Sequence, residues 1–172
     1  MAVYSTVISN ELILDKVRNF HATNILLVAC GGCANESLAF TKKIPIFLSK
    51  EGESLEKSIL CGHAVPYAAK ITADQIAEML CGKGYYAWTY IVPLNTELLC
   101  IQGKDNPTNY LNSMSKVDLI LALCCPAGLI GIKRKIKDIP VISLMRSQGQ
   151  LFYVYRDNMH SREIVYEESF VL

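Results

Sequence analysis

The sequence predicts a mixed α/β fold: a mostly parallel sheet with helices on both faces, followed by a C-terminal β-hairpin. Three observations lead to this prediction. Short, wholly apolar runs suited to buried strands alternate with segments of helical periodicity. Glycine, proline and polar residues bound most of these runs. The last two strand-like segments are separated by a mainly polar stretch, residues 156–162. Together these features favour a three-layer, flavodoxin-like arrangement.

The chain begins with a predicted helix and a predicted buried strand. Apolar residues recur at roughly helical spacing between residues 8 and 20. The run Ile25–Ala29 is wholly apolar, as expected for a strand that is covered on both faces. Gly31 and Gly32 then permit a tight turn into a helix over residues 34–40.

The following stretch is the least regular part of the sequence. Residues 44–48 are strand-like, and a polar stretch and a Cys-Gly-His segment follow them. We interpret about residues 44–66 as an insertion into the basic repeat. Thr72 opens a capping-box pattern, which predicts a helix over residues 73–81.

The second half of the chain supplies the remaining strands. Three apolar runs predict strands, and a Pro-initiated segment over about 106–115 predicts a helix between the first two. The closing hairpin is expected to pair residues 151–155 with residues 163–166. No linker, repeat or low-complexity segment interrupts the sequence, so residues 1–172 are interpreted as one domain. The three strands are Trp88–Val92, Leu119–Leu123 and Val141–Met145.

Composition narrows the function classes. The formal net charge is +1, so nothing attracts the chain generally to nucleic acid or to an anionic membrane. The basic run at residues 133–137 is interpreted as the solvated side of a helix whose Ile130 and Ile132 face the core. No apolar run reaches membrane-spanning length and no export signal is evident, which predicts a cytoplasmic protein without membrane contact.

Seven cysteines form the strongest chemical signal in the chain. In a reducing compartment they favour metal, cluster or redox roles over disulfides. Two strand-like segments end in cysteine pairs, Cys30/Cys33 and Cys124/Cys125. If these strands are neighbours, their ends lie about 5 Å apart. Ligands bind outside the carboxyl ends of strands in open α/β sheets, so the thiols are expected to meet in one pocket.

The spacing Cys30-x-x-Cys33 is the usual one for two ligands of a zinc ion or an iron–sulfur cluster. Because a second such pair is absent, further ligands must come from distant segments. Cys125 or Cys124 is the expected third ligand, with Cys61 or Cys100 as the fourth, and His63 is an alternative ligand if the metal is zinc.

Other interpretations remain open beside the metal site. Cys124 and Cys81 are expected to be buried as small apolar side chains. Cys30 and Cys33 are also candidates for a thiol–disulfide pair, with Cys30 as nucleophile and Cys33 resolving. A zinc-stabilised scaffold is the third hypothesis. The Gly31-Gly32 turn lacks the full pattern of a phosphate-binding loop.

Three segments resemble the C-terminal domain of bacterial methylenetetrahydrofolate reductases, which in some anaerobes is a separate small iron–sulfur subunit. They are LLVACGGCA at residues 26–34, VDLILALCCPAG at 117–128 and IPVISL at 139–144. Their order matches that of the family, and the similarity spans roughly residues 24–146.

The resemblance implies ligand roles for Cys30, Cys33 and Cys125, and less directly for Cys100. It implies an iron–sulfur cluster, of the 4Fe-4S type, whose potential is tuned by backbone groups at Gly31, Gly32 and Gly128. It further implies an accessory, electron-transferring subunit of one-carbon metabolism rather than a complete enzyme. The implied partner is a flavin-dependent or a corrinoid- or folate-dependent protein.

The sequence departs from the family pattern at several places. Glu36 and Ser37 stand where the family has a further cysteine, and Pro126 replaces a glycine. The family's cysteine- and glycine-rich tail is also absent. Cys61 is the candidate replacement ligand, and a zinc-bound or metal-free site remains an alternative.

Overall fold

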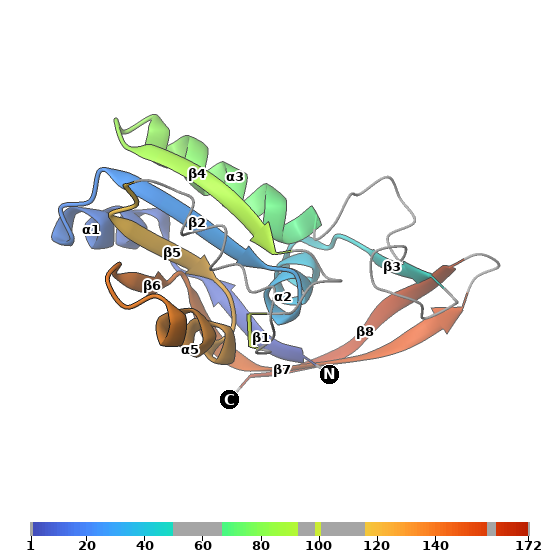
Figure 1. The fold of residues 1–172 in the computed structure, drawn as a ribbon. Helices are drawn as coiled ribbons and strands as arrows, with labels where there is room; N and C mark the ends of the chain where they lie inside the picture. Colours follow the sequence, from blue (N-terminus) through green and yellow to red (C-terminus); the bar gives the residue numbers. More distant parts are fainter. Residues whose placement is uncertain (1, 50–66, 93–98, 101–115, 158–160, 172) are drawn as a thin grey trace.

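The computed structural model describes residues 2–49, 67–92, 99–100, 116–157 and 161–171. Its strands form two four-stranded sheets (Figure 1). The first sheet is parallel throughout. Its order from edge to edge is β4 (Tyr86–Val92), β2 (Asn24–Cys30), β5 (Leu119–Leu123) and β6 (Val141–Ser143).

The second sheet is antiparallel and contains the long C-terminal hairpin. The hairpin prediction is therefore confirmed, although both strands are longer than expected. The N-terminal strand, which the sequence did not predict, pairs with the hairpin at one edge. The order is β1 (Ala2–Val7), β7 (Met145–Asp157), β8 (Ser161–Val171) and β3 (Ile46–Ser49). The mixed α/β class is confirmed, while the flavodoxin-like three-layer form stays a prediction.

Helices of the described residues connect and cover these sheets: α1 (Asn10–Asn19), α2 (Cys33–Lys42), α3 (Tyr67–Cys81) and α5 (Pro126–Lys135). Ser9 caps α1, because its hydroxyl oxygen accepts a hydrogen bond from the Leu12 N–H at 3.3 Å. α3 packs on β4 and β2, α2 packs between α3 and β1, and α5 packs on β6 (Figure 1).

The capping-box prediction at Thr72 was wrong. α3 begins at Tyr67, so Thr72 lies inside the helix, where its hydroxyl donates to the Ala68 carbonyl at 2.8 Å. A threonine in a helix interior satisfies its hydroxyl by this backward bond, and the sequence pattern does not distinguish that position from a cap. The predicted helix over 106–115 and most of the predicted insertion at 44–66 lie outside the described residues.

The core is centred on the two middle strands of the parallel sheet. All five residues of β5 are buried, as are Ile25 to Cys30 of β2. Fully burying one such leucine contributes about 1.5–3 kcal/mol relative to leaving it exposed. On α5 the core-facing prediction holds for Ile132 but fails for Ile130, which is 52% exposed. No described helix is long and apolar enough to cross a membrane.

One residue joins the two sheets. Leu144, between β6 and β7, donates its N–H to the Ala122 carbonyl of β5 at 2.9 Å. Its carbonyl accepts the Ile8 N–H, just after β1, also at 2.9 Å. Its side chain is fully buried. The chain therefore passes from the parallel sheet into the antiparallel sheet within a single residue.

Candidate functional site

The strand order creates a switch point between β2 and β5. From β2 the chain continues to β4 on one side, and it then crosses to β5 on the other side. The register pairs Ala29 of β2 with Leu123 of β5, so both strands end at the same level. In open α/β sheets this is the place where connections diverge and ligands bind. The condition set out from the sequence is met, because the two strands that end in cysteines are neighbours.

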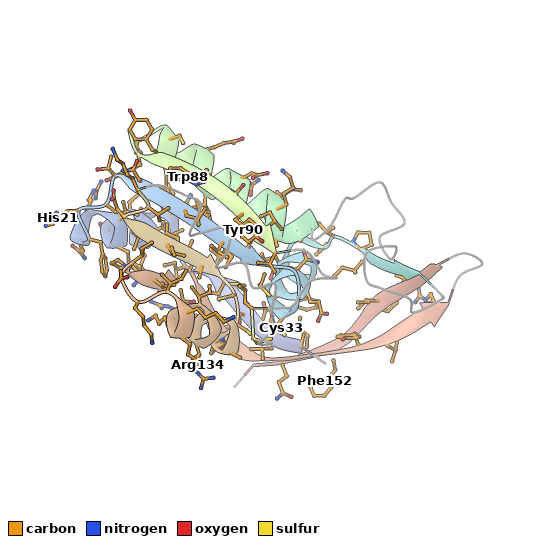
Figure 2. All side chains as sticks on the ribbon, viewed as in Figure 1. His21, Cys33, Trp88, Tyr90, Arg134 and Phe152 are labelled. Carbon is orange, nitrogen blue, oxygen red and sulfur yellow. The ribbon has the colours of Figure 1, made fainter. Side chains whose placement is uncertain are left out.

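Two of the cysteines lie at helix N-termini that face this point. Cys33 is the first residue of α2, and Cys125 is the N-cap of α5, with Pro126 at the first helical position. The side chains of Cys33 and Cys125 lie within hydrogen-bonding reach of each other. Figure 2 labels Cys33 where α2 begins, close to the carboxyl ends of the parallel strands. The site is therefore built by two strand–turn–helix units of the same kind.

Hydrogen bonding between the two side chains shifts their pKa values in opposite directions. It lowers the pKa of Cys125 to about 6, against the effect of burial, and the N–H groups of Gly128 and Ala127 lower it further. The same hydrogen bond, followed by burial, raises the pKa of Cys33. Helix N-termini stabilise thiolates because their free N–H groups point at the sulfur. The lowered pKa of Cys125 and the raised pKa of Cys33 favour the thiolate at Cys125.

Cys30 and Cys124 lie behind this pair and are almost wholly buried. Burial raises the pKa of both thiols. The charge of Cys125 raises the pKa of each further. The nucleophile hypothesis needed a lowered pKa at Cys30, and the structure gives the opposite direction. The expected burial of Cys124 is confirmed.

Cys100 reaches the site from the segment that follows β4. Its thiol lies close enough to Cys125 for that charge to raise its pKa, after the larger effect of desolvation. The neighbouring Leu99 backbone makes a hydrogen bond with the Cys30 sulfur. The backbone of this segment packs directly against α5. A Cβ atom added at Gly131 would lie 1.9 Å from the Leu99 oxygen. Only glycine permits an approach this close.

The glycines predicted to bind a cofactor lie beside the cysteines, and their cofactor role stays a prediction. The Gly32 backbone makes a hydrogen bond with the Cys30 sulfur, and the Gly128 backbone makes one with Cys125. Gly128 also packs tightly, since an added Cβ would lie 3.1 Å from the Cβ of Cys124. Gly31 is buried in the same turn.

Two contributors were missed by sequence reasoning. The Val3 backbone of β1 makes a hydrogen bond with the Cys33 sulfur, so the antiparallel sheet also borders the site. Glu36, in the first turn of α2, is half-buried, and desolvation raises the pKa of its carboxyl. Its position three residues after Cys33 was the available signal, because residues three apart share a helix face.

Five of the seven cysteines thus converge, and one does not. Cys81 ends α3 with an exposed side chain, so its predicted burial was wrong. Its thiol donates instead to the Ala87 carbonyl at 3.6 Å. Cys61 and His63 lie outside the described residues. The converging residues are Cys30, Cys33, Cys100, Cys124 and Cys125.

The donor chemistry of this cluster suits thiophilic metals, because cysteine thiolates are the preferred ligands of zinc and of iron–sulfur clusters. Among the residues that the structure describes, however, no three side chains stand in an arrangement ready to hold one metal ion. Metal binding would therefore require rotation of the thiols about their Cα–Cβ bonds, with Cys33 released from Cys125.

Comparison with protein-family models, with curated proteins and with solved structures found no match for this chain. The similarity to the reductase domain consequently rests on the three short motifs alone.

Proposed function

We propose that this chain is an iron–sulfur protein in which Cys30, Cys33 and Cys125 hold a 4Fe-4S cluster and Cys100 or Cys61 completes the ligand set. The observation that carries the proposal is the convergence of thiols from the segments after β2, β4 and β5 at the switch point of the parallel sheet. The order β4-β2-β5-β6 matches that of the first four strands of a flavodoxin-like sheet. We therefore also propose a flavodoxin-like fold for this part of the chain.

A bound cluster would supply one-electron transfer at this edge of the sheet. The chain's own residues would set its environment. Backbone groups of Gly32, Ala127 and Gly128 already make hydrogen bonds with the sulfurs, and such bonds raise the reduction potential of thiolate-held iron. Burial of Cys30 excludes water from the same side.

The biological setting is part of this proposal and rests on the motif resemblance. We infer an accessory subunit of one-carbon metabolism, which passes electrons to or from a flavin-, corrinoid- or folate-dependent partner enzyme. Cysteines that stay reduced suit the cytoplasm, notably that of an anaerobe.

Purification without oxygen tests the cluster. The expected result is a brown protein with a broad absorption band near 400 nm and about four irons and four sulfides per chain. Cys33→Ser and Cys125→Ser should each lose most of the iron. Cys81→Ser is the matched control, because this thiol is exposed at the end of α3, away from the cluster, and it should retain the iron in full.

Metal content decides between the proposal and its alternatives. Iron that persists in both Cys33→Ser and Cys125→Ser would refute the ligand assignment. Stoichiometric zinc without iron would favour the scaffold hypothesis, in which chelation unfolds the chain. Comparing Cys100→Ser with Cys61→Ser identifies the fourth ligand, since only the true ligand lowers the iron content.

A thiol redox pair is the second candidate function, and the hydrogen bond between Cys33 and Cys125 favours it. The pair differs from the one expected from the sequence, because Cys125 takes the place of Cys30 as the reactive thiolate. In metal-free protein, iodoacetamide should alkylate Cys125 first, with a rate that rises through about pH 6. Equal rates at Cys125 and Cys81 across that range would exclude this function.

A further inference from the structure

A groove of about 620 Å³ lies at the far end of α2 from the thiol cluster. It is lined by the end of α2, by the chain leading into β3, and by the outer halves of β7 and β8 (Figure 1). Because α2 has ten residues, its two ends are about 15 Å apart. The groove is therefore separate from the candidate metal site. Its volume lies within the range of small-molecule sites, about 300–1,000 Å³.

The walls of the groove are mainly apolar. Tyr4 and Phe40 meet edge to face within it, with ring centroids 5.6 Å apart and planes at 86°. Ala39 and Ile164 add buried aliphatic surface, and Ile44 is half-buried. Aromatic rings in such a pair accept a further flat ring by stacking or edge contact. The walls thus suit a flat apolar body.

Charged side chains at the rim have an excess of positive charge. Arg156 and Glu163 face each other across β7 and β8 and form an ion pair with an N–O distance of 3.8 Å. Lys43 is exposed and also lines the groove. None of the ion pairs among the described residues involves Lys43. Within the described part of the chain, Lys43 is therefore a cation without an ion-pair partner beside an apolar wall.

The backbone fixes the position of this lysine. Lys43 follows α2 in the left-handed conformation, with φ of 56° and ψ of 38°. Its N–H bonds the Phe40 carbonyl and the Ile44 N–H bonds the Ala39 carbonyl, at 3.2 and 2.9 Å, which together form a Schellman motif. Glycine is the usual residue here, because a left-handed side chain costs about 1–2 kcal/mol.

From this geometry we propose that the groove binds a small organic acid with a flat, apolar body, whose anionic group pairs with Lys43 while its ring system packs against Tyr4 and Phe40. This proposal does not depend on the metal site, since no residue is shared between the two.

Anilinonaphthalene sulfonate is a suitable probe, because it combines a flat ring system with one anionic group. Wild-type protein should bind it saturably at one site, as measured by fluorescence titration. Lys43→Gly should weaken binding about fivefold, as expected for loss of one partly exposed ion pair. The variant should fold at least as stably as the wild type, because glycine relieves the left-handed backbone. Uncharged N-phenylnaphthylamine should bind wild type and Lys43→Gly equally.

Lys116→Gly is the matched control. Lys116 is likewise exposed and left-handed, with φ of 76°, but it does not line the groove. It should bind the probe as the wild type does. Val165→Trp, which narrows the groove from β8, should abolish binding of both probes while the far-ultraviolet circular dichroism is retained.

Three outcomes would overturn the proposal. Equal weakening in Lys43→Gly and Lys116→Gly would mean that only net charge matters. Unchanged binding in Val165→Trp would place the probe elsewhere. Loss of binding in Phe152→Ser would assign the probe to the exposed apolar residues of β7, which lie outside the groove.

Discussion

The two sheets differ in how completely their strands are covered. In the parallel sheet, β5 is buried at every residue, so both of its faces are packed. In the antiparallel sheet, β7 alternates: Leu151 is fully buried, while Phe152 and Val154 are 37% and 43% exposed. Phe152 points away from the rest of the molecule in Figure 2. The cysteines of the candidate site lie at the ends of β2 and β5, the two covered strands of the parallel sheet, which hold the thiols in register.

The largest expected effect tests whether the parallel sheet carries most of the stability. Leu121→Ala removes a fully buried side chain from the middle of β5, and it should lower the free energy of unfolding by about 2–5 kcal/mol. Val154→Ala on β7 should change it by no more than about 0.5 kcal/mol. Urea denaturation measures both, and similar losses in the two variants would contradict the contrast between the sheets.

The close approach of α5 to the Leu99 segment gives the next effect. Gly131→Ala places a Cβ 1.9 Å from the Leu99 oxygen, so α5 must move. We expect a destabilisation of about 1–3 kcal/mol, although the same change in an unhindered helix stabilises. Gly82→Ala is the control, because its nearest atom is at an ordinary 3.4 Å. Thermal denaturation should rank Gly131→Ala well below Gly82→Ala, and the reverse order would refute the contact.

The contact between α2 and β1 is tested at Ser37. Its hydroxyl oxygen accepts the buried Ser5 N–H of β1 at 3.1 Å, and the same hydroxyl lies 2.9 Å from the Val3 carbonyl. Ser37→Ala leaves the Ser5 donor without this partner, at a cost of about 1–3 kcal/mol. Thr41→Ala, which removes an exposed hydroxyl from the same helix, should change stability by about 0.5 kcal/mol or less.

Ser37→Ala also tests whether the parallel and antiparallel sheets unfold together. If the sheets unfold as one unit, circular dichroism and Trp88 fluorescence should report the same denaturation midpoint in this variant. Separate midpoints would mean that the antiparallel sheet detaches first.

The smallest expected effect lies at the opposite end of the parallel sheet. Asp118 accepts hydrogen bonds from the N–H groups of Thr23 and Asn24, and these bonds lower its pKa. A lowered pKa stabilises the fold above the unfolded value of about 3.9, and this stabilisation is lost as pH falls through the folded value. Asp118→Ala should therefore be less stable than wild type at neutral pH, with the two converging as the pH falls through the lowered pKa of the folded state. A difference that persists unchanged at low pH would argue against this role.

Strands buried on both faces were the part of the fold most accessible from sequence. The run Leu119–Leu123 was predicted with its observed bounds, because a short, wholly apolar segment is typical of a strand covered on both faces. β1 was missed: it mixes polar and apolar residues, and its partner β7 lies far away in the chain. Pairing over such a separation leaves no local pattern.

The sequence indicated where the candidate site lies in the fold, but not which of its thiols ionises. Strand ends put Cys30 and Cys125 together, and the register bears this out. Which thiol ionises depends on the Cys33 hydrogen bond and on the N–H groups of Ala127 and Gly128, which exist only in the folded chain. One local signal was available: Pro126 is typical of a first helical position, which makes Cys125 the N-cap.

The placement of β1 has a consequence for synthesis on the ribosome. β1 leaves the exit tunnel long before its hydrogen-bonding partner β7, which begins only at Met145. At about 5–20 residues per second, the nascent strand waits on the order of ten seconds with both of its edges unpaired. Such a strand is open to pairing with other nascent chains on the same message. The polar side chains of Ser5 and Thr6 make β1 less prone to aggregate than the wholly apolar β5. β5 is translated when its partner strand β2 is already present.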